Sequence, residues 1–210
     1  MLPRRDQLQI RLAADDASAG GPLTYDKHQH TVEAVISMGS PVKRSYGTEL
    51  LRISPDAVDL SRLREGGIPL LDHHAQSSID KLLGRLVDAW FEHGALVGRF
   101  KFNQTEQGQK AEGMVARGEL TGISAGYRVD QWQITDADGG VVDERDARWD
   151  DDLTFTATRW QLFEASLVGV PADAASSIRS LGDPDVLRSV RARMRARHNI
   201  VLRNSRLSHE

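Results

Sequence analysis

The sequence predicts an α+β fold with a mainly antiparallel sheet or barrel, and three observations lead to this prediction. The chain has 210 residues, enough for one domain with a sizeable core. About seven segments are strand-like, several of them rich in Thr, Val, Phe and Trp. Only two or three helices are expected, and they do not alternate strictly with the strands, which argues against a parallel α/β sheet.

The first half of the chain contains a strand, a helix, a second strand and a hairpin in that order. "HTVEAVISM" (30–38) alternates, with Val32, Ala34 and Ile36 on one face. "SPDAVDLSRLREGG" (54–67) has the cap and the stop of a short helix. "IPLLDHH" (68–74) is an apolar strand that ends in polar residues. "LLGRLVDAWFEHGALVGRFKF" (82–102) reads as a hairpin with its turn at 92–94, and Phe100 and Phe102 share a face.

The second half begins with a helix predicted over 103–118, capped by Asn103 and ended by Gly118. "LTGISAGYRVDQW" (120–132) is the next strand. The polar segment 135–152 is expected to form a surface loop or ribbon, and 153–171 carries two strand-like runs that end at Pro171. We therefore expect a flexible N-terminal arm (1–30), one domain (31–182) and a basic helical tail (183–210).

The composition excludes several classes of function. There is no cysteine, so disulfides, thiolate metal sites and cysteine nucleophiles are excluded. A net charge of −3 argues against nucleic acid as a partner of the whole chain. No apolar run approaches a membrane span and the N-terminus lacks the apolar region of a signal peptide, so a cytosolic protein without membrane contact is expected. The arginine-rich tail is compatible with a nucleic-acid or acidic partner, or simply with a solvated helix.

Ser124 lies in Gly122-Ile-Ser-Ala-Gly126, which matches the Gly-x-Ser-x-Gly nucleophile elbow of α/β-hydrolases. That fold requires a helix after the serine and then a histidine, whereas the next segment looks like strand. The histidines that follow, His198 and His209, both lie in the basic tail. We therefore reject the α/β-hydrolase fold and look for a base upstream of Ser124.

A serine needs a base to be nucleophilic at neutral pH. His93 lies in the predicted hairpin turn, and His28 and His30 flank a loosely patterned segment. His73 and His74 come where an apolar strand ends, a rigid position that suits a general base.

Three segments carry a family resemblance. "LLDHHAQSSIDKLLGRL" contains a histidine followed by Gly84-Arg85, "ELTGISAGYRV" contains Ser124, and "FEASLVGVPADAAS" has the form Glu-x-Ser-x-Val-x-x-Pro-Ala. In their order His, Ser, acid, these segments resemble the prohead (capsid maturation) proteases of tailed phages. The resemblance implies Ser124 as nucleophile, His73 as base and Glu164 as the carboxylate that orients it. The family usually has His-Asp or His-Asn where this chain has His73-His74, so His74 is the alternative base.

The resemblance implies a serine endopeptidase with a fold similar to the herpesvirus assembly proteases, a β-barrel surrounded by helices. Such an enzyme would act in the host cytoplasm inside the immature capsid, cut capsid and scaffold protein and itself, and form a homo-oligomer. No cofactor and no metal are implied. Asp72 and Asp88 are alternative orienting carboxylates, the backbone around Gly122 and Gly126 is a candidate oxyanion hole, and Arg128 is a candidate for neutralising charge.

Three other interpretations rank lower. "DHH" is similar to the triplet of metal-dependent phosphoesterases, but matching upstream aspartates are missing. His28-x-His30 would need further ligands to hold a metal. The remaining alternative is a capsid-assembly or scaffold module that keeps the fold without the activity.

Overall fold

The computed structural model describes residues 8–12, 22, 24–146, 152–169 and 176–178. In these residues the fold is mostly β, with two short α-helices, α1 (Ser61–Glu65) and α2 (Glu106–Ala116), and a single 3-10 turn, η1 (Ile79–Lys81). The strands are β1 (Leu8–Leu12), β2 (Thr31–Ser37), β3 (Val42–Arg44), β4 (Gly47–Leu51), β5 (Val58–Asp59), β6 (Ile68–Asp72), β7 (Leu82–Glu92), β8 (Ala95–Phe102), β9 (Gly122–Thr135), β10 (Val141–Val142) and β11 (Thr154–Val168).

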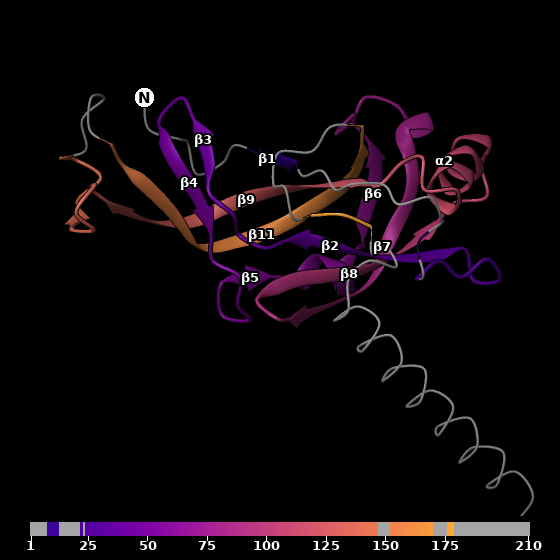
Figure 1. Ribbon diagram of the computed structural model, residues 1–210, viewed down its shortest axis with the longest axis horizontal. Coiled ribbons are helices and arrows are strands. Elements are labelled where there is room, and N and C mark those ends of the chain that lie inside the picture. The colour runs from indigo at the N-terminus through magenta and orange to yellow at the C-terminus, as the bar shows by residue number, and fades with distance from the viewer. Residues whose placement is uncertain (1–7, 13–21, 23, 147–151, 170–175, 179–210) are drawn as a thin grey trace, which may run out of the picture.

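All the strands belong to one mixed, mainly antiparallel sheet, whose main path runs β1-β9-β11-β6-β7-β8-β2. The long strands β9 and β11 pair antiparallel along most of their length and run side by side (Figure 1). β11 also pairs in parallel with β4, β5 and β6. β11 is therefore the central strand, with β9 on one side and β6 on the other.

The core follows the two-residue alternation of strand side chains. Val32, Ala34 and Ile36 of β2 are all buried, and so are Phe100 and Phe102 of β8, as predicted. The largest fully buried side chain is that of Trp160, whose indole N–H donates to the carbonyl of Arg52 at 2.9 Å. These side chains form one cluster with apolar residues of β6, β7, β9 and β11.

The two helices are shorter than predicted. Residues 54–59 form a turn and then β5, because Val58 and Asp59 pair with Trp160 and Gln161 of β11, so only Ser61–Glu65 is helical. α2 begins later than Asn103, since the side chain of Thr105 caps it by accepting the N–H of Gly108 at 3.2 Å. At residues 54–59, pairing with β11 therefore outweighs the local preference for helix.

The hairpin turn at 93–94 is confirmed, because β7 ends at Glu92 and β8 begins at Ala95. The two strand-like runs of 153–171 form one strand, β11, which stays continuous through bulges. In the polar segment 135–152 a short ribbon forms, where β10 pairs with β9. β1 lies within the segment predicted as an arm, while Pro171 and the predicted tail lie outside the described residues.

The β3–β4 hairpin was not predicted, and a buried carboxylate attaches it to the sheet. Glu49 of β4 is fully buried. It accepts hydrogen bonds from the hydroxyls of Tyr46 and Tyr127 and pairs with Arg44 at 3.2 Å. Because a buried carboxylate is costly without such partners, this network ties β4 firmly to β9.

Residues 177 and 178 connect β2, at one end of the strand path, with β9, near the other end, through two isolated bridges. Ile178 bridges Ala34 of β2, and Ser177 bridges Gly122 of β9. The N–H of Val35 donates to Ser177 and the N–H of Ile178 donates to Thr121, each at 2.9 Å. Among the described residues, no helix is long and apolar enough to cross a membrane.

Candidate active site

Three neighbouring strands bring the candidate residues together. Ser124 of β9 lies directly opposite Ser166 of β11, and Ser166 lies opposite Leu71 of β6 on the other side. Because adjacent strands are about 4.8 Å apart, these positions form one row across the sheet. The row leads from the predicted nucleophile towards the end of β6, where the histidines follow.

Ser124 lies on the face of β9 that turns away from the core cluster. Its neighbours Ile123 and Ala125 belong to that cluster, so the alternation of the strand places the hydroxyl on the opposite face. The residue is nevertheless fully buried. Its Oγ has no hydrogen-bond partner in the described part of the chain, which is unusual for a buried polar atom.

Glu164 lies over Gly126, two residues after Ser124 on the same face. The two residues are paired in register, and a bulge between Leu162 and Glu164 adjusts the direction of β11 there. A Cβ at position 126 would lie 2.6 Å from the Cδ of Glu164, so only glycine leaves room for this carboxylate. Glu164 is 2% exposed.

His74 is the histidine that meets Glu164. Its Nδ1 lies 2.5 Å from Glu164 Oε1, and its side chain is only 10% exposed. Because an ionised carboxylate only accepts hydrogen bonds, Nδ1 is the donor and carries the proton. The other ring nitrogen, Nε2, is buried and has no partner in the described part of the chain.

His73 points elsewhere and is 64% exposed. Its Nδ1 lies 2.8 Å from Asp72 Oδ1, and its Nε2 accepts the N–H of Gly169 at 3.3 Å. Both histidines have left-handed backbones, with φ of +47° for His73 and +60° for His74. This pair of left-handed residues reverses the chain after β6 and sends the two rings in different directions.

Asp72 is held by Lys81 and His73. Lys81 Nζ lies 2.7 Å from its Oδ2. This hydrogen bond, and then the one with His73, holds the pKa of Asp72 below its ordinary value. Asp72 therefore fixes His73 at the protein surface.

Ser166 is a residue to which the sequence reasoning assigned no role. It is fully buried, its hydroxyl donates to Glu164 Oε2 at 2.9 Å, and it accepts the backbone N–H of His74 at 2.9 Å. The signal in the sequence is its spacing: two residues after Glu164, it falls on the same face of the strand.

The other predicted residues do not join this group. Asp88 makes an ion pair with Arg99 at 3.8 Å. The guanidinium of Arg128 lies over the ring of Phe163, 4.9 Å from its centroid. Arg85 lies in β7, paired with Pro69 of β6.

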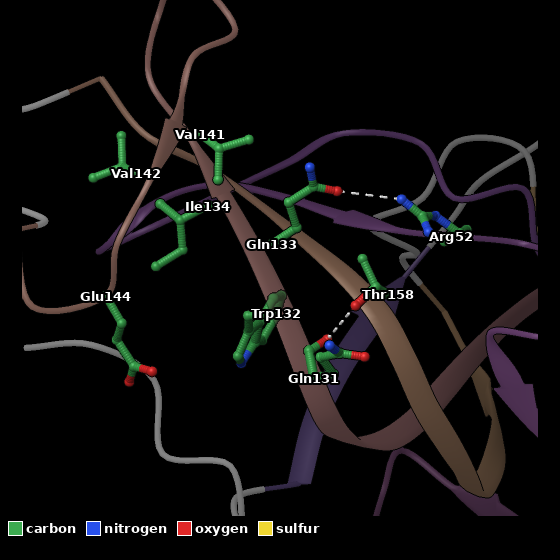
Figure 2. A pocket seen from close by; sticks show the side chains of 9 residues that line it. All are labelled: Arg52, Gln131, Trp132, Gln133, Ile134, Val141, Val142, Glu144 and Thr158. Atoms are coloured by element: carbon green, nitrogen blue, oxygen red, sulfur yellow. Dashed lines mark hydrogen bonds between the residues drawn. The ribbon is translucent and has the colours of Figure 1, made fainter.

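Two hollows are lined by residues other than Ser124, His74, Glu164 and Ser166. One of about 370 Å³ is at the end of β9 where β10 pairs with it, and its lining includes Trp132, Arg52 and Glu144 (Figure 2). The other, about 610 Å³, is lined by residues that include Arg62, Arg85 and Lys101. Among the described residues, no group of three or more histidine, aspartate or glutamate side chains is placed to hold a metal ion.

Comparison with known proteins places the chain in a family. Residues 25–187 match the family described as Caudovirus prohead serine protease. The chain is 30% identical over 139 residues, 66% of its length, to the major capsid protein of Halomonas phage phiHAP-1, of which it spans about a fifth (21%). The structure of the bacteriophage T4 capsid assembly protease, gp21, aligns with 76% of this chain and 96% of its own at 17% identity and a TM-score of 0.44. Since the family match covers most of the chain, including all three candidate segments, this protein belongs to the Caudovirus prohead serine protease family.

Proposed function

We propose that this chain is a serine endopeptidase in which Ser124 is the nucleophile, His74 the general base and Glu164 the carboxylate that orients it. The observation that supports this proposal is the hydrogen bond between His74 and Glu164. In addition, the buried atoms His74 Nε2 and Ser124 Oγ have no partner in the part of the chain that the structure describes. A serine nucleophile needs a nearby base that can accept its proton. The Ser124 hydroxyl is the available donor and His74 Nε2 the available acceptor.

The geometry supports His74 rather than His73 as the base. His73 is exposed, and both its ring nitrogens are already in hydrogen bonds, with Asp72 and Gly169. The hydrogen bond to Glu164 fixes the tautomer of His74 with the proton on Nδ1, which leaves Nε2 as an acceptor.

The reaction would follow from these roles. Ser124 Oγ attacks the scissile carbonyl while His74 Nε2 takes its proton, and Glu164 stabilises the imidazolium that forms. His74 then gives the proton to the leaving amine, so the peptide C–N bond breaks and an acyl-enzyme remains. A water molecule, deprotonated by the same nitrogen, hydrolyses the ester and regenerates the serine.

We propose capsid and scaffold protein, and the chain itself, as substrates, cleaved inside the immature capsid in the host cell. The family assignment supports this setting, and the relative from phage phiHAP-1 is by name a major capsid protein. A homo-oligomer remains a prediction from the resemblance.

We also propose that the sheet closes into a barrel. The bridges of Ser177 to β9 and of Ile178 to β2 support this closure, because they connect the end of the strand path to its beginning.

Labelling with a serine-directed phosphonate tests the proposal and separates an enzyme from an inactive assembly module. The wild-type chain should gain one adduct, located on Ser124 by peptide mass spectrometry. Ser124→Ala and His74→Ala should not be labelled. Ser176→Ala is the matched control, since Ser176 is also buried and its hydroxyl has no partner among the residues that the structure describes. An unlabelled wild-type chain with intact fold would favour the inactive module.

A further inference from the structure

We infer that Ser166 is a positioning residue of this active site: its hydroxyl holds the Glu164 carboxylate and the backbone of His74 in one closed ring of hydrogen bonds. The inference rests on the proposed function, and it assigns a role in the reaction to a residue that does not touch the substrate.

The ring is formed by three hydrogen bonds. Ser166 Oγ donates to Glu164 Oε2 at 2.9 Å, Glu164 Oε1 accepts from His74 Nδ1 at 2.5 Å, and the N–H of His74 donates back to Ser166 Oγ at 2.9 Å. The two carboxylate oxygens therefore have different partners. A carboxylate held at both oxygens cannot rotate about its terminal bond, so Oε1 stays aimed at the imidazole.

The bond to the backbone of His74 has a second effect. At φ +60° this residue has a left-handed backbone, which is unfavourable for a residue with a side chain. His74 lies beyond the end of β6, so the sheet ladder does not hold it. The hydroxyl of Ser166 supplies an acceptor inside the protein, and it keeps the histidine in the one conformation that brings its ring to Glu164.

The position of Ser166 also links its hydroxyl to the proposed nucleophile. It lies opposite Ser124 in the sheet, so the residue that holds the base is the cross-strand neighbour of the nucleophile. Cross-strand neighbours on one face lie about 5 Å apart. A shift of Ser166 would thus move the base relative to the attacking oxygen, and misplacement by about 1 Å can cost on the order of 10²-fold in rate.

The test compares Ser166→Ala, Ser166→Thr and the control Ser176→Ala in phosphonate labelling and in hydrolysis of a peptide shown to be cleaved. Ser166→Ala should lower kcat about 10- to 100-fold with KM nearly unchanged, by analogy with residues that orient catalytic ligands. Ser166→Thr keeps the hydroxyl and should restore most of the rate. Ser176→Ala should behave as wild type. A wild-type kcat in Ser166→Ala would overturn the inference.

Proton NMR gives a reading that does not depend on activity. A short hydrogen bond from His74 Nδ1 to a carboxylate should give a proton signal far downfield, absent in His74→Ala. Ser166→Ala should shift or broaden this signal, and an unchanged signal would contradict the inference. If Ser166→Ala does not fold, Ser166→Cys keeps nearly the same volume with a weak donor, and its kcat should fall while its fold remains.

The same variants distinguish a failure of the proposed function from a failure of the role inferred for Ser166. Full activity in Ser124→Ala or His74→Ala would refute the proposed function itself. Loss of activity in both, with full activity in Ser166→Ala, would refute only the role of Ser166.

Discussion

The carboxylate of Glu164 occupies the space that a side chain at Gly126 would fill, with the Cδ of Glu164 only 2.6 Å from a Cβ built there. The lack of a side chain at Gly126, in the middle of β9, thus makes room for the Glu164 carboxylate. Gly126→Ala should push Glu164 away from His74 and reduce the phosphonate labelling rate of Ser124 at least about 10²-fold.

The control for this change is Gly113→Ala in α2, where a Cβ would meet only the end of the Arg117 side chain. It should leave the labelling rate unchanged and stabilise the helix by up to about 1 kcal/mol. A normally labelled Gly126→Ala variant would mean that Glu164 is not held as described.

Alanine substitutions of His73 and His74 should have very different effects on kcat. His74→Ala should lose on the order of 10⁶-fold in kcat, as expected when the histidine of a triad is removed. His73→Ala should stay within a few-fold of wild type, because its ring is exposed and pairs with Asp72. The measurement is peptide hydrolysis by both variants at one pH, and the reverse pattern would restore His73 as the base.

Glu164→Gln tests whether the charge of the carboxylate matters beyond its shape. The amide keeps the size but cannot stabilise an imidazolium, and its NH₂ group can favour the wrong tautomer of His74. We expect kcat to fall about 10³- to 10⁴-fold with an unchanged circular dichroism spectrum. A loss below about tenfold would show that another group orients the histidine.

Because Lys81 pairs with Asp72, part of the free energy of unfolding should depend on pH. The pKa of Asp72 is lowered in the folded chain, chiefly by Lys81, so the folded state favours the ionised carboxylate. This contribution is present above the unfolded-state pKa of about 3.9 and is lost as the pH falls through the folded-state pKa.

Lys81→Met should therefore raise the pKa of Asp72, measured by NMR of the carboxyl carbon. The difference in free energy of unfolding between wild type and variant should shrink as the solution is acidified. A difference that stays constant with pH would mean that the lysine stabilises the fold in another way. Lys110→Met, an exposed change on α2, is the control.

Tyr127 belongs to the same segment as Ser124 but faces the core, where its hydroxyl donates to the buried Glu49. Tyr127→Phe should lower the free energy of unfolding by about 1–3 kcal/mol, because a buried carboxylate loses a donor. Labelling of the folded variant by the phosphonate should remain close to wild type. Chemical denaturation measures the first effect, and a large loss of labelling without loss of stability would contradict this division of roles.

The strands that carry the site could be predicted because their patterns are strong. The alternation of β2 and β8 and the turn at His93-Gly94 follow from residue type alone. The helix predicted from Ser54 was mostly wrong, since its residues pair with β11, a contact more than a hundred residues away that no local pattern reveals. The β3–β4 hairpin depends on the buried Glu49, which reads as an ordinary surface glutamate in the sequence.

For the site, the sequence could name the residue types and their order but not decide between adjacent histidines. That choice depends on two successive left-handed backbones, which turn the rings apart. Ser166 was visible only as part of a motif, because its partners lie on a different strand and on the backbone of His74.

The hydrogen bonds of His74 span 90 and 92 residues of sequence. Contacts of such range form late, because the intervening chain must first be ordered. Since Glu164 of β11 follows Ser124 and His74 in the sequence, the nascent chain contains the serine and the histidine before it contains the carboxylate. The order of synthesis thus brings Glu164 last of the three, and the hydrogen bonds of His74 can form only after β11 has been made.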